Sequence, residues 1–346
     1  MKSHVHRILI NESIIPDGLE VITRFKSFSE IRNGIFTTIR RLRIQYPGAL
    51  IYYKNPNSFF TKAFLERNPE CKLYNDEKID LEITPNDYLS WRLLPLISKQ
   101  IEDDLNYFDE TSKWQKKFKV RADRFHIYGK SKHLYIHPSS IIYPNVVFDV
   151  SSGPIIIDKN VKITSFSFLE GPLYIAEDAQ IDNARITGAT VIGRACRIGG
   201  EVGNSIFENF ANKHHEGFVG HSHIGSWVNI GAMATTSDLK NNYGIVKVKN
   251  QFKQISTDTI KFGSIIGDFS KIAIGVMLNT GTIVDIGANV TKGRVNGYIP
   301  PFSWAESSDK YRLDHFIQDT KKIMARRNQT LSFEEEVLLK SLYEGL

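Results

Sequence analysis

A six-residue repeat constrains the fold of this chain more than any other feature of its sequence. Between about residue 134 and residue 295, isoleucines recur in pairs six positions apart: Ile136 and Ile142, Ile157 and Ile163, Ile175 and Ile181, Ile192 and Ile198, Ile224 and Ile230, and Ile266 and Ile272. Small residues that leave room for a turn, such as Ser140, Ala179, Cys196 and Ala234, follow four positions after several of these isoleucines. The pattern predicts a hexapeptide β-helix.

In a β-helix of this kind, each hexad forms one short strand and a turn, and three hexads close a triangular coil with its aliphatic residues inside. A sandwich is not favoured, because strand pairs joined by Asn-Gly or Asp-Gly turns are missing from this region. Two polar segments, residues 201–220 and 235–259, interrupt the hexads. We expect both to loop out of the β-helix and to carry binding groups.

The whole chain of 346 residues is predicted to be an α+β multidomain protein. Residues 1–125 read as a small degenerate α/β domain with a linker to 133, residues 134–300 as the β-helix, and residues 301–346 as C-terminal helices. In the first part, 8–10 and 49–53 look like strands, and 29–44 and 93–107 like helices. Apolar spacing predicts a helix over 309–327, and Ser332 with Glu335 forms a capping box before a second one.

Composition indicates in which cellular compartment the protein is expected. The two cysteines, Cys71 and Cys196, form no CxxC pair, which indicates a reducing compartment and argues against a disulfide or zinc-cysteine framework. No apolar run reaches membrane-spanning length, and the first residues lack the features of a secretion signal, so we expect a cytoplasmic protein. A basic run from Lys113 to Lys132 contributes to the net charge of +6 and is interpreted as a solvated linker. No nucleic-acid partner is expected.

Four histidines fall within ten residues: His214, His215, His221 and His223. One interpretation is a metal site, with Glu216 as a neighbouring carboxylate. The other is a general base, because a neutral imidazole accepts a proton near pH 7, as required when an amine attacks a thioester. Since successive residues of an extended segment point to opposite sides, we expect His214 and His215 not to serve the same site.

Other polar residues of the two interruptions offer supporting roles. Glu216 is a candidate for orienting the imidazole, and Lys213 for holding a substrate phosphate. Asn242, or backbone amides beside Gly244, would stabilise the oxyanion of a tetrahedral intermediate.

Residues 134–327 resemble the hexapeptide-repeat acyltransferases. Within them, the chain is most similar to the alternative bacterial sugar nucleotidyltransferase-like proteins related to the bifunctional glucosamine-1-phosphate N-acetyltransferase/N-acetylglucosamine-1-phosphate uridyltransferase. The strings that carry the resemblance are SSGPIIID, IGGEVGNS, NKHHEGFVG, IGSWVNIGA, LKNNYG, MLNTGT, IPPFSW and MARR. The resemblance implies a left-handed β-helix, a homotrimer, and acetyl-CoA bound between coils of neighbouring subunits.

The family's NKAHDG string falls on residues 212–217. It implies that His215 is the catalytic histidine and that Lys213 binds a phosphate. His214 and Glu216 stand where the family has alanine and aspartate, which leaves the fit of the substrate open.

Two further strings assign binding residues by the same resemblance. VNIGA places Asn229 at a sugar-contacting asparagine and Ala232 near the amide contacts of acetyl-CoA. NNYG places Asn242 and Tyr243 at the oxyanion and sugar side.

The predicted function is therefore acetyl-CoA-dependent N-acetylation of an amino-sugar phosphate or amino-sugar nucleotide, similar to glucosamine-1-phosphate, of the kind used in cell-envelope biosynthesis. Acetyl-CoA is the expected co-substrate, and acyl transfer needs no metal. The N-terminal strings RFKSFSEIRNGIFTTIRRL and PLISKQIEDDLNYF resemble the family weakly. This region is too short for a working nucleotidyltransferase and lacks a glycine-rich phosphate loop, so we expect no nucleotidyl transfer. Three alternatives stay open: a metal-dependent lyase like γ-carbonic anhydrase, a bifunctional sugar-1-phosphate nucleotidyltransferase, and a non-catalytic trimeric scaffold.

Overall fold

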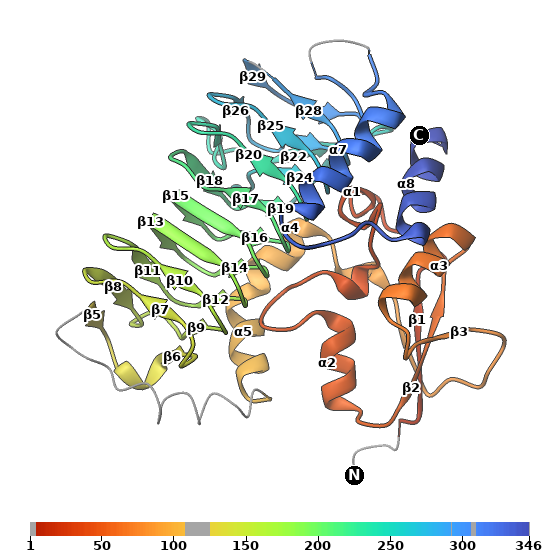
Figure 1. The fold of residues 1–346 in the computed structure, drawn as a ribbon, viewed down its shortest axis with the longest axis horizontal. Coiled ribbons are helices and arrows are strands. Elements are labelled where there is room, and N and C mark those ends of the chain that lie inside the picture. Colours follow the sequence, from red (N-terminus) through yellow and green to blue (C-terminus); the bar gives the residue numbers. More distant parts are fainter. Residues whose placement is uncertain (1–4, 108–124, 292, 306–308, 346) are drawn as a thin grey trace.

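The computed structural model describes residues 5–107, 125–291, 293–305 and 309–345. A left-handed parallel β-helix makes up most of the described chain, and Figure 1 shows its coils stacked as a ladder. The parallel pairing of each strand with the strand one coil away confirms the fold predicted from the hexads.

Three faces form the β-helix. The first face is a nine-stranded sheet of β6 (Leu134–Ile136), β9 (Ile155–Ile157), β12 (Leu173–Ile175), β14 (Thr190–Ile192), β16 (Ile206–Phe207), β19 (His223–Ile224), β24 (Ile265–Ile266), β27 (Ile283–Val284) and β30 (Tyr298–Ile299).

The second face contains β7 (Ile141–Ile142), β10 (Lys162–Ile163), the start of β13 (Gln180–Thr187), the start of β15 (Arg197–Gly203), β17 (Asn212–Lys213), β20 (Asn229–Ile230), β25 (Lys271–Ile272) and β28 (Asn289–Val290). The third face contains β5 (Phe125–Tyr128), β8 (Val146–Asp149), β11 (Phe168–Glu170), the ends of β13 and β15, β18 (Phe218–Gly220), β21 (Thr235–Thr236), β26 (Met277–Leu278) and β29 (Arg294–Val295). Strands β13 and β15 continue around the corner between these two faces, with a register shift between Asp182 and Ala184.

The N-terminal domain is built on a four-stranded parallel sheet in the order β3-β2-β1-β4. Its strands are β1 (Arg7–Asn11), β2 (Leu50–Lys54), β3 (Lys72–Leu73) and β4 (Leu81–Ile83), and its helices are α1 (Glu20–Thr23), α2 (Thr38–Gln45), α3 (Ser58–Arg67), α4 (Ser90–Leu93) and α5 (Ile97–Leu105). The helix expected over 29–44 is confined to α2, because Gly34 takes a φ of 137° that no helix contains. The helix expected over 93–107 is divided by a 3₁₀ turn at Leu94–Leu96, where Pro95 has no amide to donate.

This domain packs on the outside of the first face. The outward residues there form a column that is apolar except for His223, which lies between Ile206 and Ile265. Its apolar members are buried in one hydrophobic core with the N-terminal domain: Ile156, Tyr174, Val191, Ile206, Ile265 and Ile283. Buried ion pairs flank the apolar contact. Arg24 meets Asp285 at 2.7 Å, and Lys26 lies 3.3 Å from Asp268. The two parts therefore form one packed body, shown side by side in Figure 1.

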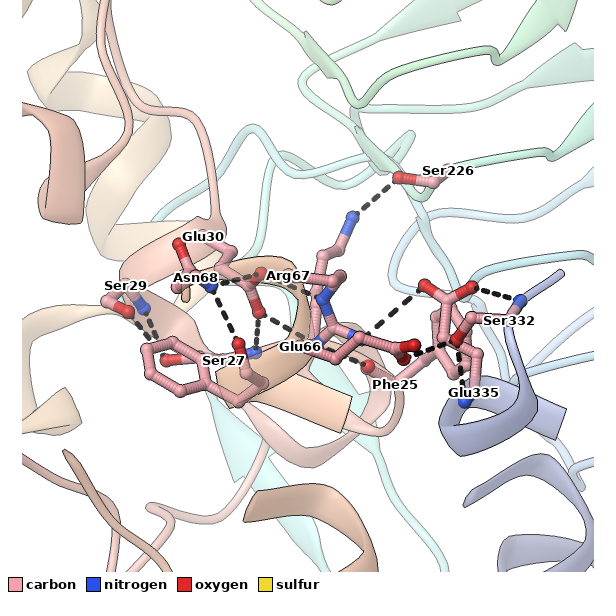
Figure 2. A network of polar contacts seen from close by, with 12 residues as sticks. Phe25, Ser27, Ser29, Glu30, Glu66, Arg67, Asn68, Ser226, Ser332 and Glu335 are labelled. Carbon is pink, nitrogen blue, oxygen red and sulfur yellow. Dashed lines mark hydrogen bonds and ion pairs between the residues drawn. The ribbon is translucent and has the colours of Figure 1, made fainter. Parts of the chain in front are cut away.

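Two helices follow the last coil, α7 (Leu313–Ala325) and α8 (Phe333–Gly345). The predicted capping box is confirmed, because the Glu335 amide donates to Ser332 Oγ and the Ser332 amide donates to the Glu335 carboxylate. Helix α8 packs against α3, with Arg67 between Glu30 and Glu335, and Ser332 donating to Glu66 (Figure 2). The C-terminal end of the chain thus lies against the N-terminal domain. None of the described helices is both long and apolar enough to cross a membrane.

Only one of the two expected interruptions leaves the β-helix. Residues 201–220 stay in it, because β15, β16, β17 and β18 keep their parallel register. Of the expected interruption 235–259, Thr235 and Thr236 form β21 in the third face, and residues 237–259 do loop out. This loop carries the antiparallel pair β22 (Lys247–Lys249) and β23 (Gln254–Ser256). The Asn250 side chain donates to Glu20 at 2.8 Å, which ties this loop to the N-terminal domain.

Candidate functional site

A column of outward polar side chains on the second face forms one wall of a pocket in the described structure. Strand register aligns Arg197, Asn212, Asn229 and Lys271 in four successive coils. The Asn212 side-chain amide donates to Asn229 Oδ1 at 2.7 Å, so the middle of the column is held together.

The end of α7 forms the opposite wall. Ile323, Arg326 and Arg327 line, together with the column, a pocket of about 480 Å³. Phe210 and Trp227 also line it, with ring centroids 4.1 Å apart and planes 3° from parallel. Both occupy corresponding left-handed turn positions of consecutive coils, which is why their rings stack.

His214 and His215 enter this pocket from a corner that is two residues longer than the corner of the preceding coil. In the coil before, Gly199 and Gly200 alone connect Ile198 to Glu201; in the histidine coil, the four residues 214–217 connect the corresponding positions, Lys213 and Phe218. The following coil also has four residues, 231–234, between Ile230 and Thr235, so the Gly199–Gly200 corner is the short one. Residues 214–217, at the corner between the second and third faces, are called the 214–217 bulge because they exceed the preceding corner by two residues.

The expectation that the two histidines serve different sites is wrong. Both rings line the pocket, with centroids 5.1 Å apart and planes at 41°. Alternation of side chains holds for an extended strand, whereas this segment bends around a corner. His214 Nε2 donates to Asp182 Oδ2 at 2.6 Å, and Asp182 comes from the corresponding corner two coils earlier. His215 is exposed, and no hydrogen bond to its ring is found among the described residues.

Lys213 does not lie in the pocket, which contradicts its predicted role as a phosphate ligand. Its side chain points into the β-helix and is 1% exposed. Nζ donates to the carbonyl oxygens of Gly199 at 2.8 Å and His215 at 2.7 Å. Burial lowers the pKa of Lys213 to about 8, against the opposing influence of the Glu216 carboxylate.

The remaining predicted residues are dispersed. Asn229 lines the pocket, but Glu216, Ala232, Asn242 and Tyr243 are not among its lining residues. Glu216 is exposed on the bulge, and its carbonyl accepts a hydrogen bond from the Met233 amide. The Ala232 carbonyl accepts one from Gly275 in the next coil. Asn242 Oδ1 accepts from the Gly244 amide within the protruding loop, where Tyr243 is exposed.

The other two histidines of the cluster lie elsewhere. His221 Nδ1 is 2.6 Å from Asp238 Oδ2, and the hydrogen bond from His221 lowers the pKa of Asp238. His223 is fully buried at the domain contact, where it meets Ser90 and Glu208. Within the described ranges, no three His, Cys, Asp or Glu side chains gather closely enough to hold a metal ion.

The pocket is strongly cationic. Arg197, Lys271, Arg326 and Arg327 line it, and none of the described residues that line it is acidic. Burial lowers the pKa of Arg327, and the positive charges of Arg197 and Arg326 lower it further. Burial also lowers the pKa of Lys271. Positive groups crowded in this way are stabilised by an anionic ligand.

Sequence reasoning did not identify these four cations as one group. Arg197 and Lys271 each stand immediately before an inward isoleucine on the second face, so aligning the coils brings them into one column. Arg326 and Arg327 lie in the MARR string, but no sequence signal places that string over the second face.

The chain is 30% identical over 179 residues to the bifunctional protein GlmU of Thermodesulfovibrio yellowstonii, a match that covers 47% of this chain and 37% of the relative. It is 29% identical over 184 residues to the bifunctional protein GlmU of Wigglesworthia glossinidia brevipalpis, covering 49% and 37%. The resemblance to the hexapeptide-repeat acyltransferases is confirmed. The chain matches little more than a third of the length of these relatives, and no family model matches it.

Solved hexapeptide-repeat acyltransferases superpose only loosely. A UDP-N-acetylglucosamine acyltransferase from Francisella novicida is 14% identical, with 63% of this chain and 78% of that chain covered and a TM-score of 0.29. A perosamine N-acetyltransferase from Caulobacter crescentus, crystallised with CoA and GDP-perosamine, is 13% identical, with 88% and 97% covered and a TM-score of 0.19. The fold assignment therefore rests on the strand topology of the chain itself.

Proposed function

We propose that the chain is an acetyl-CoA-dependent N-acetyltransferase whose acceptor is an amino-sugar phosphate or an amino-sugar nucleotide. The observation that carries the proposal is a histidine pair inside a pocket lined by four cations and no described acid. An acceptor of this class brings both complementary groups, a phosphate for the cations and an amine for a histidine. The similarity to the bifunctional GlmU proteins supports the same class.

In the proposed reaction, His215 acts as the general base. Its ring accepts a proton from the sugar amine as the nitrogen attacks the thioester carbonyl, and the C–N bond forms. The C–S bond of the tetrahedral intermediate then breaks, and the imidazolium returns its proton to the departing thiolate. His214, held by Asp182, lies next to this ring and fixes one side of the pocket.

The cations of the pocket would bind the phosphate of the acceptor. Arg197 and Lys271 approach it from the β-helix, and Arg326 and Arg327 from the residues that follow α7. Asn229, exposed between them, is the proposed contact for a sugar hydroxyl.

A neighbouring copy would complete the site in a homotrimer. Ala232, Asn242 and Tyr243 lie outside the pocket of their own chain. Buried Val246 and Val248 anchor the loop of residues 237–259, whereas Tyr243 is exposed. Around a threefold axis, such a loop reaches the pocket of the next subunit. There, Asn242 would donate to the oxyanion, while Tyr243 and Ala232 would contact the sugar and acetyl-CoA.

The test is release of free thiol from acetyl-CoA in the presence of glucosamine-1-phosphate, amino-sugar nucleotides and unphosphorylated glucosamine. We expect thiol release with a phosphorylated acceptor and little with glucosamine at the same concentration. Absence of release with every acceptor would refute the acetyltransferase. Hydration of CO₂ by a metal-loaded sample would then support the lyase, and an inert trimer would support the scaffold.

A further inference from the structure

One lysine occupies a position inside the β-helix that aliphatic residues hold in the other coils. On the second face, the inward residues of successive coils are stacked by register: Ile163, Ile181, Ile198, Lys213, Ile230, Ile272 and Val290. Lys213 is as deeply buried as the residues around it, and no salt bridge of Lys213 is found in the described part of the chain.

The ammonium group of Lys213 donates hydrogen bonds to backbone carbonyls of two successive coils. Nζ reaches the corner next to it and donates to His215 O, inside the bulge, and to Gly199 O, at the same corner of the preceding coil. One side chain thereby connects the backbone of the longer corner to that of the shorter one.

The preceding coil is shaped to accept this arrangement. A side chain at Gly199 would collide with the carbonyl of His214, and a Cβ at Gly200 would lie 2.9 Å from Lys213 Nζ. Gly200 also takes a φ of 69°, where a side chain is disfavoured. The shorter corner therefore fits beneath the longer one only because residues 199 and 200 are glycines. The buried Lys213 contacts both corners beneath the histidines.

Stability does not account for the lysine, because a buried ammonium that forms no salt bridge among the described residues costs free energy that an aliphatic residue would not. We propose that Lys213 is a positioning residue, which holds the 214–217 bulge in the shape that turns His215 into the pocket. The proposal rests on the function proposed above for the reaction, but the effect of the lysine on the bulge is independent of it.

The decisive variant is Lys213→Met, which removes the ammonium group and keeps an apolar side chain of similar length inside the β-helix. We expect melting at the same or a higher temperature and an unchanged oligomeric mass. We also expect kcat to fall by about 10²-fold with little change in KM, because a catalytic group displaced by about 1 Å loses about that much rate. The matched control is Lys162→Met, which changes a lysine on β10 outside the pocket and should leave both constants unchanged.

The kinetic pattern separates positioning from phosphate binding. If Lys213 bound the phosphate, its loss would raise KM for glucosamine-1-phosphate and would not affect turnover of glucosamine. If it positions the bulge, kcat falls by the same factor with both acceptors. A selective change in KM, or unchanged kinetics, would overturn the proposal.

A second measurement does not depend on activity. The Met233 amide donates to Glu216 O at 2.7 Å, and the Glu201 amide donates to Gly217 O at 3.1 Å, so both amides report on the bulge. We expect their hydrogen exchange to accelerate at least about tenfold in Lys213→Met, while the Ile230 amide keeps its protection. Unchanged exchange would refute the positioning role. Exchange that accelerates in a protein whose wild type releases no thiol would instead keep that role and refute the acetyltransferase.

Discussion

Asp182 and His214 lie 32 residues apart in the sequence and meet through a hydrogen bond of 2.6 Å between Oδ2 and Nε2. The carboxylate accepts from Nε2–H, which leaves Nδ1 of a neutral His214 as the ring atom without the proton. A second histidine, His215, stands with its ring 5.1 Å away. The pocket thus contains one histidine fixed by a carboxylate and one exposed to a ligand.

The two histidines are expected to differ in their contribution to turnover. His215→Ala should lower kcat by about 10² to 10⁴-fold, as loss of a general base does, with partial recovery at high pH where more of the amine is deprotonated. His214→Ala and Asp182→Asn should each cost about tenfold, because both act through the position of His215. Steady-state kinetics checks this, with His126→Ala, an exposed histidine on β5, as the control. A larger loss for His214→Ala would make His214 the base.

The arginines at the end of α7 are expected to determine affinity for the phosphorylated acceptor. Replacing Arg326 and Arg327 together by methionine should raise KM for that acceptor at least about tenfold, since each charge-assisted hydrogen bond contributes roughly 1.5–3 kcal/mol. kcat should change much less. Arg312→Met, at the other end of α7 and paired with Asp314, is the control. If KM for acetyl-CoA alone rises, these arginines bind the phosphates of the cofactor instead.

The buried Lys213 predicts a specific dependence of stability on pH. In the folded chain the pKa of Lys213, about 8, lies below the ordinary lysine value of 10.5. Between these values, the unfolded chain binds more protons than the folded chain, so the stability of the wild type rises with pH. The advantage of Lys213→Met should therefore be largest below pH 8 and shrink as the pH approaches 10.5. Denaturant melts of both proteins across this range check it, and a constant difference would show that Lys213 does not titrate there.

Completion of the site by a neighbouring copy can be tested by complementation. Light scattering should give about three times 39.4 kDa. Separately inactive His215→Ala and Asn242→Ala proteins should regain part of the activity when co-expressed, because some sites in a mixed trimer combine two intact halves. Mixing after folding, without exchange of subunits, serves as the control. A monomeric mass would remove the shared site.

The N-terminal domain is expected to transfer no nucleotidyl group. One of its buried carboxylates, Glu12, already accepts hydrogen bonds from the Ser27 hydroxyl, the Phe28 amide and the Tyr53 hydroxyl, and burial raises its pKa. Such a group is poorly suited to hold Mg²⁺. Incubation with UTP, Mg²⁺ and N-acetylglucosamine-1-phosphate should release no pyrophosphate. Sustained release would restore the bifunctional alternative.

Sequence periodicity was sufficient to predict the β-helix, because the inward isoleucines lie at regular intervals in most coils. It failed where a coil changes length. Ile198 follows Ile181 by 17 residues, but the next inward residue of this column follows after 15 and is Lys213. A pattern that counts only aliphatic residues reads this coil as an interruption, which is why residues 201–220 were expected to loop out.

The residues of the candidate site could be predicted only in part from the sequence, for the same reason. His215 and Asn229 were identified from the resemblance, and both lie at the pocket. Asp182 was not, because its contact with His214 depends on which corners coincide. The role of Lys213 was misassigned, because no local signal distinguishes an inward lysine from an outward one.

The docking of the N-terminal domain also limits how the β-helix can evolve. Solenoids commonly gain or lose whole coils, because each coil contacts only its neighbours. Here, Arg32 lies over the ring of Tyr174, while Arg24 binds Asp285 several coils further along. Deleting one coil between them would shift Asp285 by about 4.8 Å relative to Tyr174. One of the two arginines would then lose its partner, so a globular domain fixes the repeat number of an otherwise extendable array.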